Sequence, residues 1–273
     1  MSRRVLVTGA ASGLGRAIAA AAAGAGWRVL LTDLDGDAAR RAAAELAAAT
    51  GVDVRPLALD VRDEQAWDAA VTTVRDAWGG LDVLVNNAGV AAGGRIDHLP
   101  LEDWQWIVDI NVLGAVRGCR AFVPLLKEQG SGHVVNVASL AGLLHPPFMA
   151  SYNVTKAGVV ALSETLRAEL EPYGIATTCV CPGFFPTDLG TTLRSPDPAV
   201  HELTAKLMAS SDVTADDVAA MVLEAVEDGT FLVLTERAGR IAYGAKRFAP
   251  WLFRRQVATA TGKLRRRIEG SPA

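Results

Sequence analysis

The chain has 273 residues, of which 50% are hydrophobic and 21% charged, and its formal net charge is −3. This length and composition predict one large α/β domain or two small ones with a sizeable core, and the near balance of charges argues against a nucleic-acid partner. The N-terminal residues lack the apolar core of a signal peptide, and no apolar run reaches the roughly 18 residues of a membrane span, so we expect a cytoplasmic protein.

Short apolar runs alternate along the chain with longer, alanine-rich helical segments. Strands are predicted at 4–8, 28–33, 54–61, 82–89, 133–139, 175–183 and 231–235, and helices at 13–25, 36–50, 63–78, 102–128, 150–172 and 214–229. Strands that are apolar throughout are typical of a parallel sheet covered on both faces. The repeated rhythm of strand and helix therefore predicts a single doubly wound, Rossmann-type α/β domain, with a parallel sheet of about seven strands and helices on both faces.

The first predicted strand leads directly into a glycine-rich turn, "TGAASGLG", at residues 8–15. Glycines without a Cβ atom let a pyrophosphate approach the backbone, and the following helix offers N–H donors and a favourable dipole. A turn that only packs the helix against the strand is the alternative, but the position between first strand and first helix favours dinucleotide binding. The expected cofactor contacts in this turn are Gly9, Ser12, Gly13, Leu14 and Gly15.

The second predicted strand ends at Asp33. A carboxylate at this place can accept hydrogen bonds from both ribose hydroxyls of an adenosine, and it would repel a 2′-phosphate. Neither Ser12 nor Leu34 adds a positive charge. The sequence therefore predicts NAD rather than NADP, with a turn aspartate that caps the next helix as the alternative.

Further motifs follow in order along the chain, most of them at the ends of predicted strands and two within predicted helices. They are "LDV" at 59–61, "NNAG" at 86–89, "DINVLG" around Asn111, "VVNVAS" ending at Ser139, "YNVTK" at 152–156 and "PGFFPT" at 182–187. Together with the glycine-rich turn, they resemble the motifs of the short-chain dehydrogenase/reductase family over about residues 4–235. The resemblance implies an oxidoreductase that transfers a hydride between a nicotinamide dinucleotide and an alcohol or ketone.

Tyr152 and Lys156 lie one helical turn apart in a segment of small and apolar residues. A phenol has a pKa of about 10, too high for a base near neutral pH, and a neighbouring ammonium group stabilises the phenolate. We therefore expect Lys156 to lower the pKa of Tyr152, which would act as general acid/base. The resemblance also implies that Lys156 binds the nicotinamide ribose. From the residues alone, the alternative is a core tyrosine with a lysine that extends past it to solvent.

Ser139 ends a predicted strand, at the sheet edge where ligands of parallel folds bind, and its hydroxyl can orient the substrate oxygen; a turn serine is the alternative. Asn111 lies inside a predicted helix, where asparagine is unfavourable. The resemblance implies that its side chain holds a water linking Lys156 to solvent, and the alternative is a buried asparagine bound to a backbone carbonyl. The predicted catalytic set is Asn111, Ser139, Tyr152 and Lys156.

The resemblance also assigns residues at or just beyond the ends of the third, fourth and sixth predicted strands to the walls of the cofactor site. These are Asp60 and Val61 beside the adenine, Asn87, Ala88 and Gly89 beside the nicotinamide ribose, and Pro182, Gly183, Phe185 and Thr187 beside the nicotinamide. Tyr152 and Lys156 complete the set. For the two asparagines of "NNAG", Asn86 and Asn87, a hydrogen-bonded turn is the simpler interpretation.

The expected substrate is a hydrophobic, uncharged secondary alcohol or ketone. Apolar residues dominate the segments after Val90, Ser139 and Gly183, and no cluster of basic residues lies near them.

Two other functions remain open: a β-ketoacyl-thioester reductase and a non-catalytic dinucleotide-binding sensor or scaffold. Asp33 argues against the first, which would usually use NADP, and the intact catalytic set argues against the second.

The composition becomes basic and aromatic after Thr235. We expect residues 1–235 to form the dinucleotide-binding catalytic domain and residues 236–273 a basic C-terminal extension, not a separate domain. The extension is compatible with docking on a neighbouring subunit, with contact to an anionic membrane surface, or with a solvated basic helix. By analogy with the family, we expect a homodimer or homotetramer.

The three cysteines and four histidines show no spacing typical of a metal site. We therefore expect no bound metal, and we expect Cys119, Cys179 and Cys181 to be buried and reduced. Among the histidines, only His145 is expected near the substrate. Residues 184–212 predict a long loop with a short helix.

Overall fold

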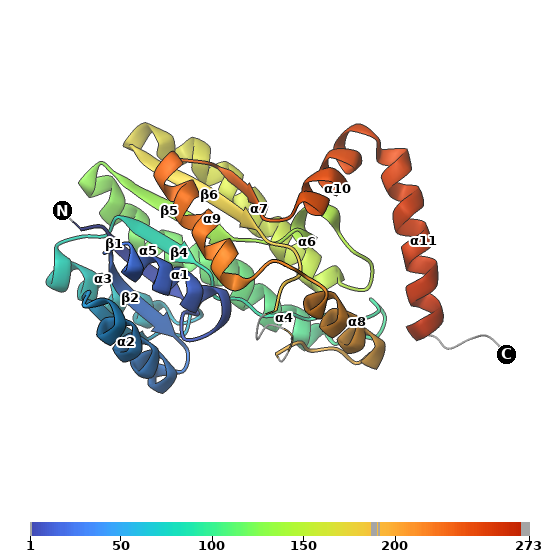
Figure 1. Cartoon of the computed structure of the whole chain (residues 1–273), viewed down its shortest axis with the longest axis horizontal. Helices are drawn as coiled ribbons and strands as arrows, with labels where there is room; N and C mark the ends of the chain where they lie inside the picture. The colour runs from blue at the N-terminus through green and yellow to red at the C-terminus, as the bar shows by residue number, and fades with distance from the viewer. Residues whose placement is uncertain (1, 187–189, 191, 269–273) are drawn as a thin grey trace.

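The computed structural model describes residues 2–186, 190 and 192–268, and its seven strands form a sheet in the order β3-β2-β1-β4-β5-β6-β7 (Figure 1). The strands are β1 (Arg4–Thr8), β2 (Arg28–Asp33), β3 (Val54–Ala58), β4 (Val83–Asn86), β5 (Gly132–Val137), β6 (Ile175–Cys181) and β7 (Leu232–Leu234). All neighbouring strands are parallel. The predicted doubly wound, Rossmann-type sheet is therefore confirmed.

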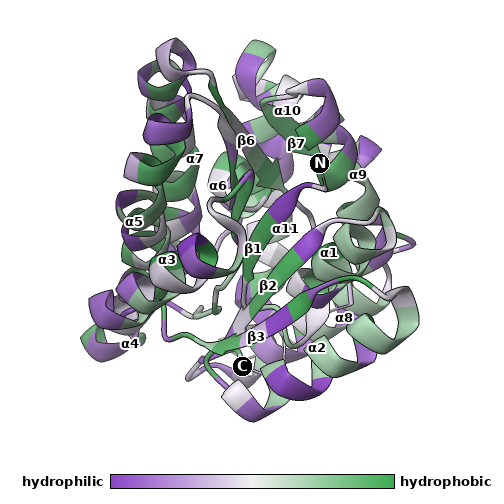
Figure 2. Cartoon of the chain, turned by 90° about the vertical axis from the view of Figure 1, so that its left-hand side faces the viewer, coloured by the Kyte–Doolittle hydropathy of each residue, from purple (hydrophilic) through white to green (hydrophobic). Residues whose placement is uncertain are grey.

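Helices cover both faces of the sheet, as Figure 2 shows. One layer consists of α1 (Gly13–Gly24), α2 (Gly36–Thr50) and α9 (Ala215–Asp228), and the other of α3 (Glu64–Trp78), α5 (Gly114–Gln129) and α7 (Ala150–Leu170). Successive strand residues point to opposite faces, so in β1 Val5 and Val7 pack with the first layer, while Leu6 packs with the second. Both faces of the sheet are therefore buried, which explains why the strands are apolar throughout.

Four predicted strands that carried motif residues end earlier than expected. β3 ends at Ala58, β4 at Asn86, β5 at Val137 and β6 at Cys181, instead of at 61, 89, 139 and 183. Beyond these ends the backbone leaves the sheet; the N–H of Asn87, for example, bonds to Thr8 Oγ1. The motif residues therefore lie in loops at the carboxyl edge of the sheet.

The helix predicted over 102–128 is interrupted in the structure. It consists of α4 (Leu101–Val108), a π-helical turn η1 (Asp109–Leu113) and α5. The wider π-helical turn changes which side chains face inward, and such turns are frequent at functional sites. Here it contains the buried Asn111.

Shorter elements connect these layers. They are α6 (Ala141–Leu144) before α7, η2 (Glu171–Tyr173) after it, and α8 (Pro198–Ala209) before α9. α8 is the short helix predicted within residues 184–212, although 187–189 and 191 lie outside the described residues.

The basic extension after β7 folds into two helices, α10 (Arg237–Phe248) and α11 (Pro250–Ile268). α10 packs on the body of the protein, where a Cβ atom at Gly239 would overlap the side chain of Leu140. α11 lies away from the sheet and contacts α8 (Figure 1). None of the helices in the described part of the chain is long and apolar enough to cross a bilayer. The first half of the extension is thus packed on the body, and the second half projects from it.

Candidate active site

A cavity of about 800 Å³ lies at the carboxyl edge of the sheet, where the strand order reverses between β1 and β4. Ligands of open α/β sheets bind in the crevice at this reversal. The predicted site residues in its wall are Gly9, Ser12, Gly13, Leu14, Gly15, Asp33, Asp60, Val61, Asn87, Ala88, Gly89, Ser139, Tyr152, Lys156, Pro182, Gly183 and Phe185. Asn111 is not part of the wall, and Thr187 lies outside the described residues.

The glycine-rich turn after β1 has no room for larger residues. Gly9 and Gly13 have positive φ angles of 61° and 52°, which favour glycine. A Cβ atom at Gly15 would lie 2.5 Å from Nδ2 of Asn87 and would overlap the backbone of Gly9. The start of α1 is therefore held directly against the end of β1, which gives the cavity a narrow cradle of backbone at a helix N-terminus. Such a cradle fits a pyrophosphate.

Asn87 closes this turn from the side of β4. Its Nδ2 donates to the carbonyl oxygens of Thr8 and Gly9 at 2.8 and 3.2 Å. The hydroxyl of Thr8 accepts in return from the N–H groups of Asn87 and Ala88, each at 3.0 Å. The simpler interpretation of Asn87 as a hydrogen-bonded turn residue therefore holds, and Thr8, which the sequence analysis did not assign, is its partner.

Asp33 faces the same turn from the end of β2. Its Oδ2 accepts from the N–H of Ala11 at 3.0 Å, and its Oδ1 accepts from the N–H of Asp35 at 3.1 Å. The cap of α2 is Asp35, which accepts from the N–H groups of Asp37 and Ala38. Asp33 is therefore not the helix cap that the alternative required, and its carboxylate is fixed at the cavity wall.

One arginine at the predicted adenine end of the cavity was not assigned by the sequence analysis. Arg62 lines the wall, and its Nη2 lies 2.6 Å from Oδ2 of Asp60. The hydrogen bond from this guanidinium holds the pKa of Asp60 below its usual range. The ion pair compensates the charge of Arg62 beside the predicted adenine site.

Tyr152 and Lys156 lie together on the cavity side of α7. Both side chains are buried, and Nζ of Lys156 lies 5.8 Å from the centroid of the Tyr152 ring. Nζ also donates to the carbonyl oxygen of Val137 at 2.9 Å, at the end of β5. Lys156 therefore does not extend to solvent, which excludes the alternative of a lysine that passes a core tyrosine.

The pKa of Tyr152 differs from the expectation. Burial raises it to about 12, and a hydrogen bond with Ser139 offsets only part of this effect. Burial also lowers the pKa of Lys156 to about 8. The Lys156 ammonium group does not produce the expected lowering of this pKa, because removing the phenolate from water raises the pKa more than the hydrogen bond with Ser139 lowers it. In the protein alone, Tyr152 is a protonated phenol at neutral pH.

Ser139 lies just beyond the end of β5. Its Oγ accepts from the N–H of Ala141 at 3.1 Å and donates to the carbonyl oxygen of Pro182 at 3.3 Å. The turn role that was left as the alternative is therefore real. The same hydroxyl reaches Tyr152 and lines the cavity, so the turn fixes it where a reacting oxygen can bind.

Asn111 joins the loop after β4 to α7 without lining the cavity. Its Nδ2 donates to the carbonyl oxygen of Val90 at 2.9 Å and to Thr155 Oγ1 at 3.2 Å, and its Oδ1 accepts from the N–H of Val90 at 2.8 Å. Both hydrogens of the amide are thus bound by protein groups. The structure agrees with the alternative, a buried asparagine bound to a backbone carbonyl, and offers no side-chain N–H for the predicted water.

α10 forms one wall of the cavity. The sequence analysis placed these residues in the C-terminal extension and assigned them no part in the site. Glu236, which precedes α10, and Ala238, Gly239 and Ala242 on it line the cavity. The small residues at 238, 239 and 242 share one helix face, which is the signal that sequence reasoning missed.

His145 does not line the cavity, contrary to the expectation. Its Nδ1 lies 2.8 Å from Nζ of Lys246 on α10, and its Nε2 lies 3.1 Å from the carbonyl oxygen of Gly142. It has a positive φ of 55° at the end of α6. His145 therefore links α6 to α10 behind the cavity wall.

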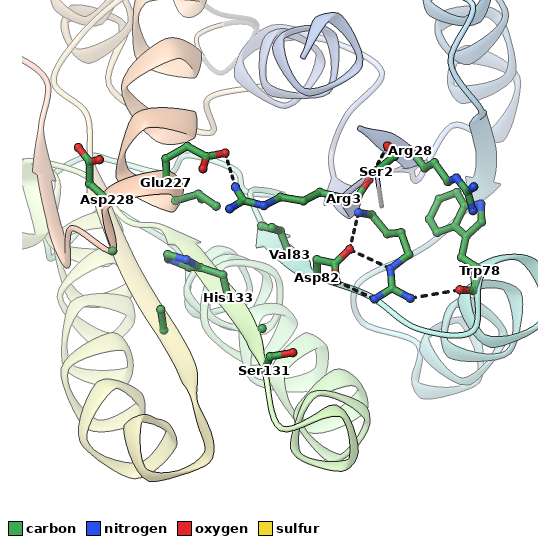
Figure 3. A pocket seen from close by; sticks show the side chains of 15 residues that line it. Ser2, Arg3, Arg28, Trp78, Asp82, Val83, Ser131, His133, Glu227 and Asp228 are labelled. Carbon is green, nitrogen blue, oxygen red and sulfur yellow. Dashed lines mark hydrogen bonds and ion pairs between the residues drawn. The ribbon is translucent and has the colours of Figure 1, made fainter. Parts of the chain in front are cut away.

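A second cavity of about 730 Å³ lies at the amino edge of the sheet (Figure 3). Charged residues line it, but they pair with each other: Arg3 with Glu227, and Arg4 with Asp82 through bonds of 2.6 and 2.8 Å. None of the predicted site residues lies there. Its polar groups tie the strand starts together.

The three cysteines are buried and unpaired, as predicted. Burial raises the pKa of Cys119 to about 12, so this thiol stays protonated. Within the described part of the chain, no three His, Cys, Asp or Glu side chains gather in a group that could hold a metal ion.

Comparison with known proteins gives a consistent result. The sequence model described as short chain dehydrogenase matches residues 3–198. A 1-deoxy-11-beta-hydroxypentalenate dehydrogenase from Streptomyces exfoliatus is 36% identical over 245 residues, which cover 88% of this chain and 85% of that protein. A probable oxidoreductase, EphD, from Mycobacterium tuberculosis strain H37Rv is 34% identical over 270 residues, which cover 96% of this chain. Because they cover only 45% of EphD, this chain spans less than half of the length of that relative.

The fold comparison agrees with the sequence comparison. The crystal structure of a short chain dehydrogenase/reductase from Burkholderia phymatum, in complex with NAD, matches with a TM-score of 0.86 and 33% identity. The match covers 92% of this chain and 95% of that one. The resemblance inferred from the motifs is therefore confirmed by a sequence model, by curated relatives and by a solved structure.

Proposed function

Because the chain belongs to the short-chain dehydrogenase/reductase family, we propose that it is an oxidoreductase that transfers a hydride between NAD(H) and a hydrophobic secondary alcohol or ketone. The observation that carries the proposal is the buried pair of Tyr152 and Lys156 beside Ser139, in the same cavity as the glycine-rich turn. The cradle formed by Gly9, Gly13 and Gly15 fits a dinucleotide.

In this proposal, Tyr152 moves the proton of the substrate oxygen. The bound nicotinamide supplies the hydride for reduction and, when oxidised, accepts a hydride and adds a positive charge near the phenol. Ser139 orients the substrate oxygen through its hydroxyl, and Lys156 stabilises the phenolate that forms. Burial raises the pKa of Tyr152 to about 12, so the phenol carries the proton that reduction of a carbonyl requires, although the raised pKa also makes it a weaker acid.

The apolar lining of the cavity supports a hydrophobic substrate. Side chains in the wall include Trp106, Leu140, Leu144, Met149 and Phe184.

The two other functions, a β-ketoacyl-thioester reductase and a non-catalytic sensor, predict different outcomes in one assay. NADH formation with a panel of cyclic and aliphatic secondary alcohols tests the proposal. Tight NAD binding without turnover of any alcohol or ketone would favour the sensor.

The preference for NAD depends on Asp33. Replacing it by Asn keeps a carbonyl acceptor for the N–H of Ala11 but removes the charge that repels a 2′-phosphate. Hydrogen bonds to charged groups contribute about 1.5–3 kcal/mol, so we expect KM for NAD to rise about tenfold or more and the NADP to NAD ratio of kcat/KM to increase. Steady-state kinetics with both cofactors measure this.

An exposed aspartate provides the control for this substitution. Asp37→Asn removes a carboxylate from the start of α2, outside the cavity wall. It should leave the cofactor ratio unchanged. A preference of the unmodified protein for NADP would overturn the assignment.

We also propose that the corner between α10 and α11 binds an anionic membrane surface. Every charged residue from 237 to 268 is Arg or Lys. At the corner, Phe248 is 82% exposed and Trp251 70% exposed. Exposed aromatic side chains next to basic ones are typical of segments that lie in a membrane interface.

Co-sedimentation with vesicles tests this surface without removing the wall that α10 gives the cavity. Phe248→Glu combined with Trp251→Glu is expected to abolish binding to vesicles that contain anionic lipid, while activity on a soluble alcohol stays unchanged. Equal binding by the variant would exclude the membrane contact. A change in oligomeric state instead, measured by light scattering, would assign the corner to the homodimer or homotetramer that we expect.

A further inference from the structure

Glu236 places a carboxylate inside the cavity of the candidate active site. It lies between the end of β7 and the start of α10, and it lines the same cavity as Ser139 and Tyr152. A Cβ atom at Gly183 would overlap both carboxylate oxygens of Glu236. The carboxylate therefore lies directly against Gly183, where the absence of a side chain leaves room for it in this conformation.

This carboxylate has no structural partner among the described residues. Glu236 occupies the N-cap position of α10, but its side chain makes no capping hydrogen bond. Its Oε1 is shielded from solvent and accepts no hydrogen bond. Burial raises its pKa, as expected for a carboxyl group that has lost water without gaining a partner. A helix cap or an ion pair would explain a half-buried glutamate with one shielded oxygen, but neither is present among the described residues.

A buried acceptor without a partner is unfavourable, and a ligand that donates a hydrogen bond removes this cost. The cavity wall contains hydroxyl groups, such as those of Ser139 and Tyr152, but none of the described residues donates a hydrogen bond to Oε1 of Glu236. The missing donor is therefore expected on a molecule that enters the cavity.

We propose that Glu236 binds a second hydroxyl group of the substrate, away from the alcohol or ketone that reacts. The inference rests on the proposed function and narrows it: the substrate is hydrophobic but carries two oxygen functions, one at Tyr152 and one at Glu236. A carboxylate at this place also rejects substrates with a carboxylate of their own, through repulsion between like charges. The carboxamide of the nicotinamide also carries N–H donors. The experiment therefore has to distinguish a hydroxyl group of the substrate from the carboxamide of the cofactor as the donor to Glu236.

The test compares cyclohexanol with the isomeric cyclohexanediols in the full-length protein. A site built around a hydroxyl group discriminates strongly against molecules that lack it. For the unmodified protein, we expect kcat/KM to be at least about tenfold higher for one diol than for cyclohexanol. Glu236→Ala should abolish this ratio by lowering kcat/KM for the diol alone. Glu169→Ala, which removes an exposed glutamate of α7, is the matched control and should leave the ratio unchanged.

Two further readouts distinguish the possible explanations. If Glu236 had only a structural role, Glu236→Gln would lower Tm; we expect Tm to stay equal or rise, because a buried carboxyl without a partner is removed. A weaker affinity for NADH in Glu236→Ala, with an unchanged diol ratio, would assign Glu236 to the carboxamide and overturn the proposal. Absence of turnover with every alcohol would instead contradict the proposed function. In that case, calorimetry of diol and cyclohexanol binding to the NAD-loaded protein still decides, and equal affinities overturn the role of Glu236.

Discussion

Replacing Tyr152 by Phe is expected to lower kcat by about 10²–10⁴-fold, the usual contribution of a positioned general acid/base. The substitution removes only the phenolic oxygen from a buried ring, so the fold and the affinity for NAD should change little. Stopped-flow or steady-state measurement of NADH consumption with a ketone gives the rate, and fluorescence titration gives the affinity. A variant that keeps more than about a tenth of the activity would contradict the proposed role of Tyr152.

A second tyrosine beside a lysine provides the control. Nζ of Lys127 lies 4.0 Å from the centroid of the Tyr173 ring, closer than Lys156 is to Tyr152. Tyr173 is 47% exposed and does not line the cavity. Tyr173→Phe should leave the rate unchanged. The comparison shows why a lysine beside a tyrosine does not by itself make a general acid: the phenol must also face a cavity where substrate and dinucleotide can meet.

The sequence was sufficient to predict the sheet and most of the cavity wall. Most motifs lie at the ends of strands, and the carboxyl ends of parallel strands meet at one edge, so residues as distant as Gly9 and Gly183 come together once the topology is known. The early ends of β3, β4, β5 and β6 did not disturb this result, because the motifs needed only to lie near the carboxyl ends of the strands.

Three features could not be predicted, because each depends on contacts between distant segments. The π-helical turn around Asn111 is fixed by hydrogen bonds to Val90, in the loop after β4, and to Thr155 on α7. The raised pKa of Tyr152 comes from burial by the whole fold, which the spacing to Lys156 does not reveal. The third feature, the wall formed by α10, depends on how the extension returns to the body, whereas composition alone indicated a basic tail.

Replacing Gly15 by Ala is the second substitution with a large expected effect, and it acts on the cradle rather than on the chemistry. The added Cβ atom would lie 2.5 Å from Nδ2 of Asn87 and would overlap the backbone of Gly9. Backbone atoms cannot move aside as the end of a side chain can, so α1 must shift away from β1. Overpacking of this kind costs about 1–3 kcal/mol. We expect a lower Tm and a dissociation constant for NAD that rises about tenfold or more, since tenfold corresponds to about 1.4 kcal/mol.

Gly24→Ala at the other end of the same helix is the matched control. No atom lies within 4 Å of a Cβ built at this position, and its φ is not positive. Alanine in a helix is more stable than glycine by about 0.5–1 kcal/mol, so Tm should rise slightly while NAD affinity stays the same. The same chemical change would then lower Tm at Gly15 and raise it at Gly24, within one helix. The loss of stability at Gly15 would therefore come from the contact with Gly9 and Asn87 and not from helix propensity. If Gly15→Ala bound NAD as tightly as the unmodified protein, the turn after β1 would not be the pyrophosphate cradle, and the dinucleotide site would have to be sought elsewhere in the cavity.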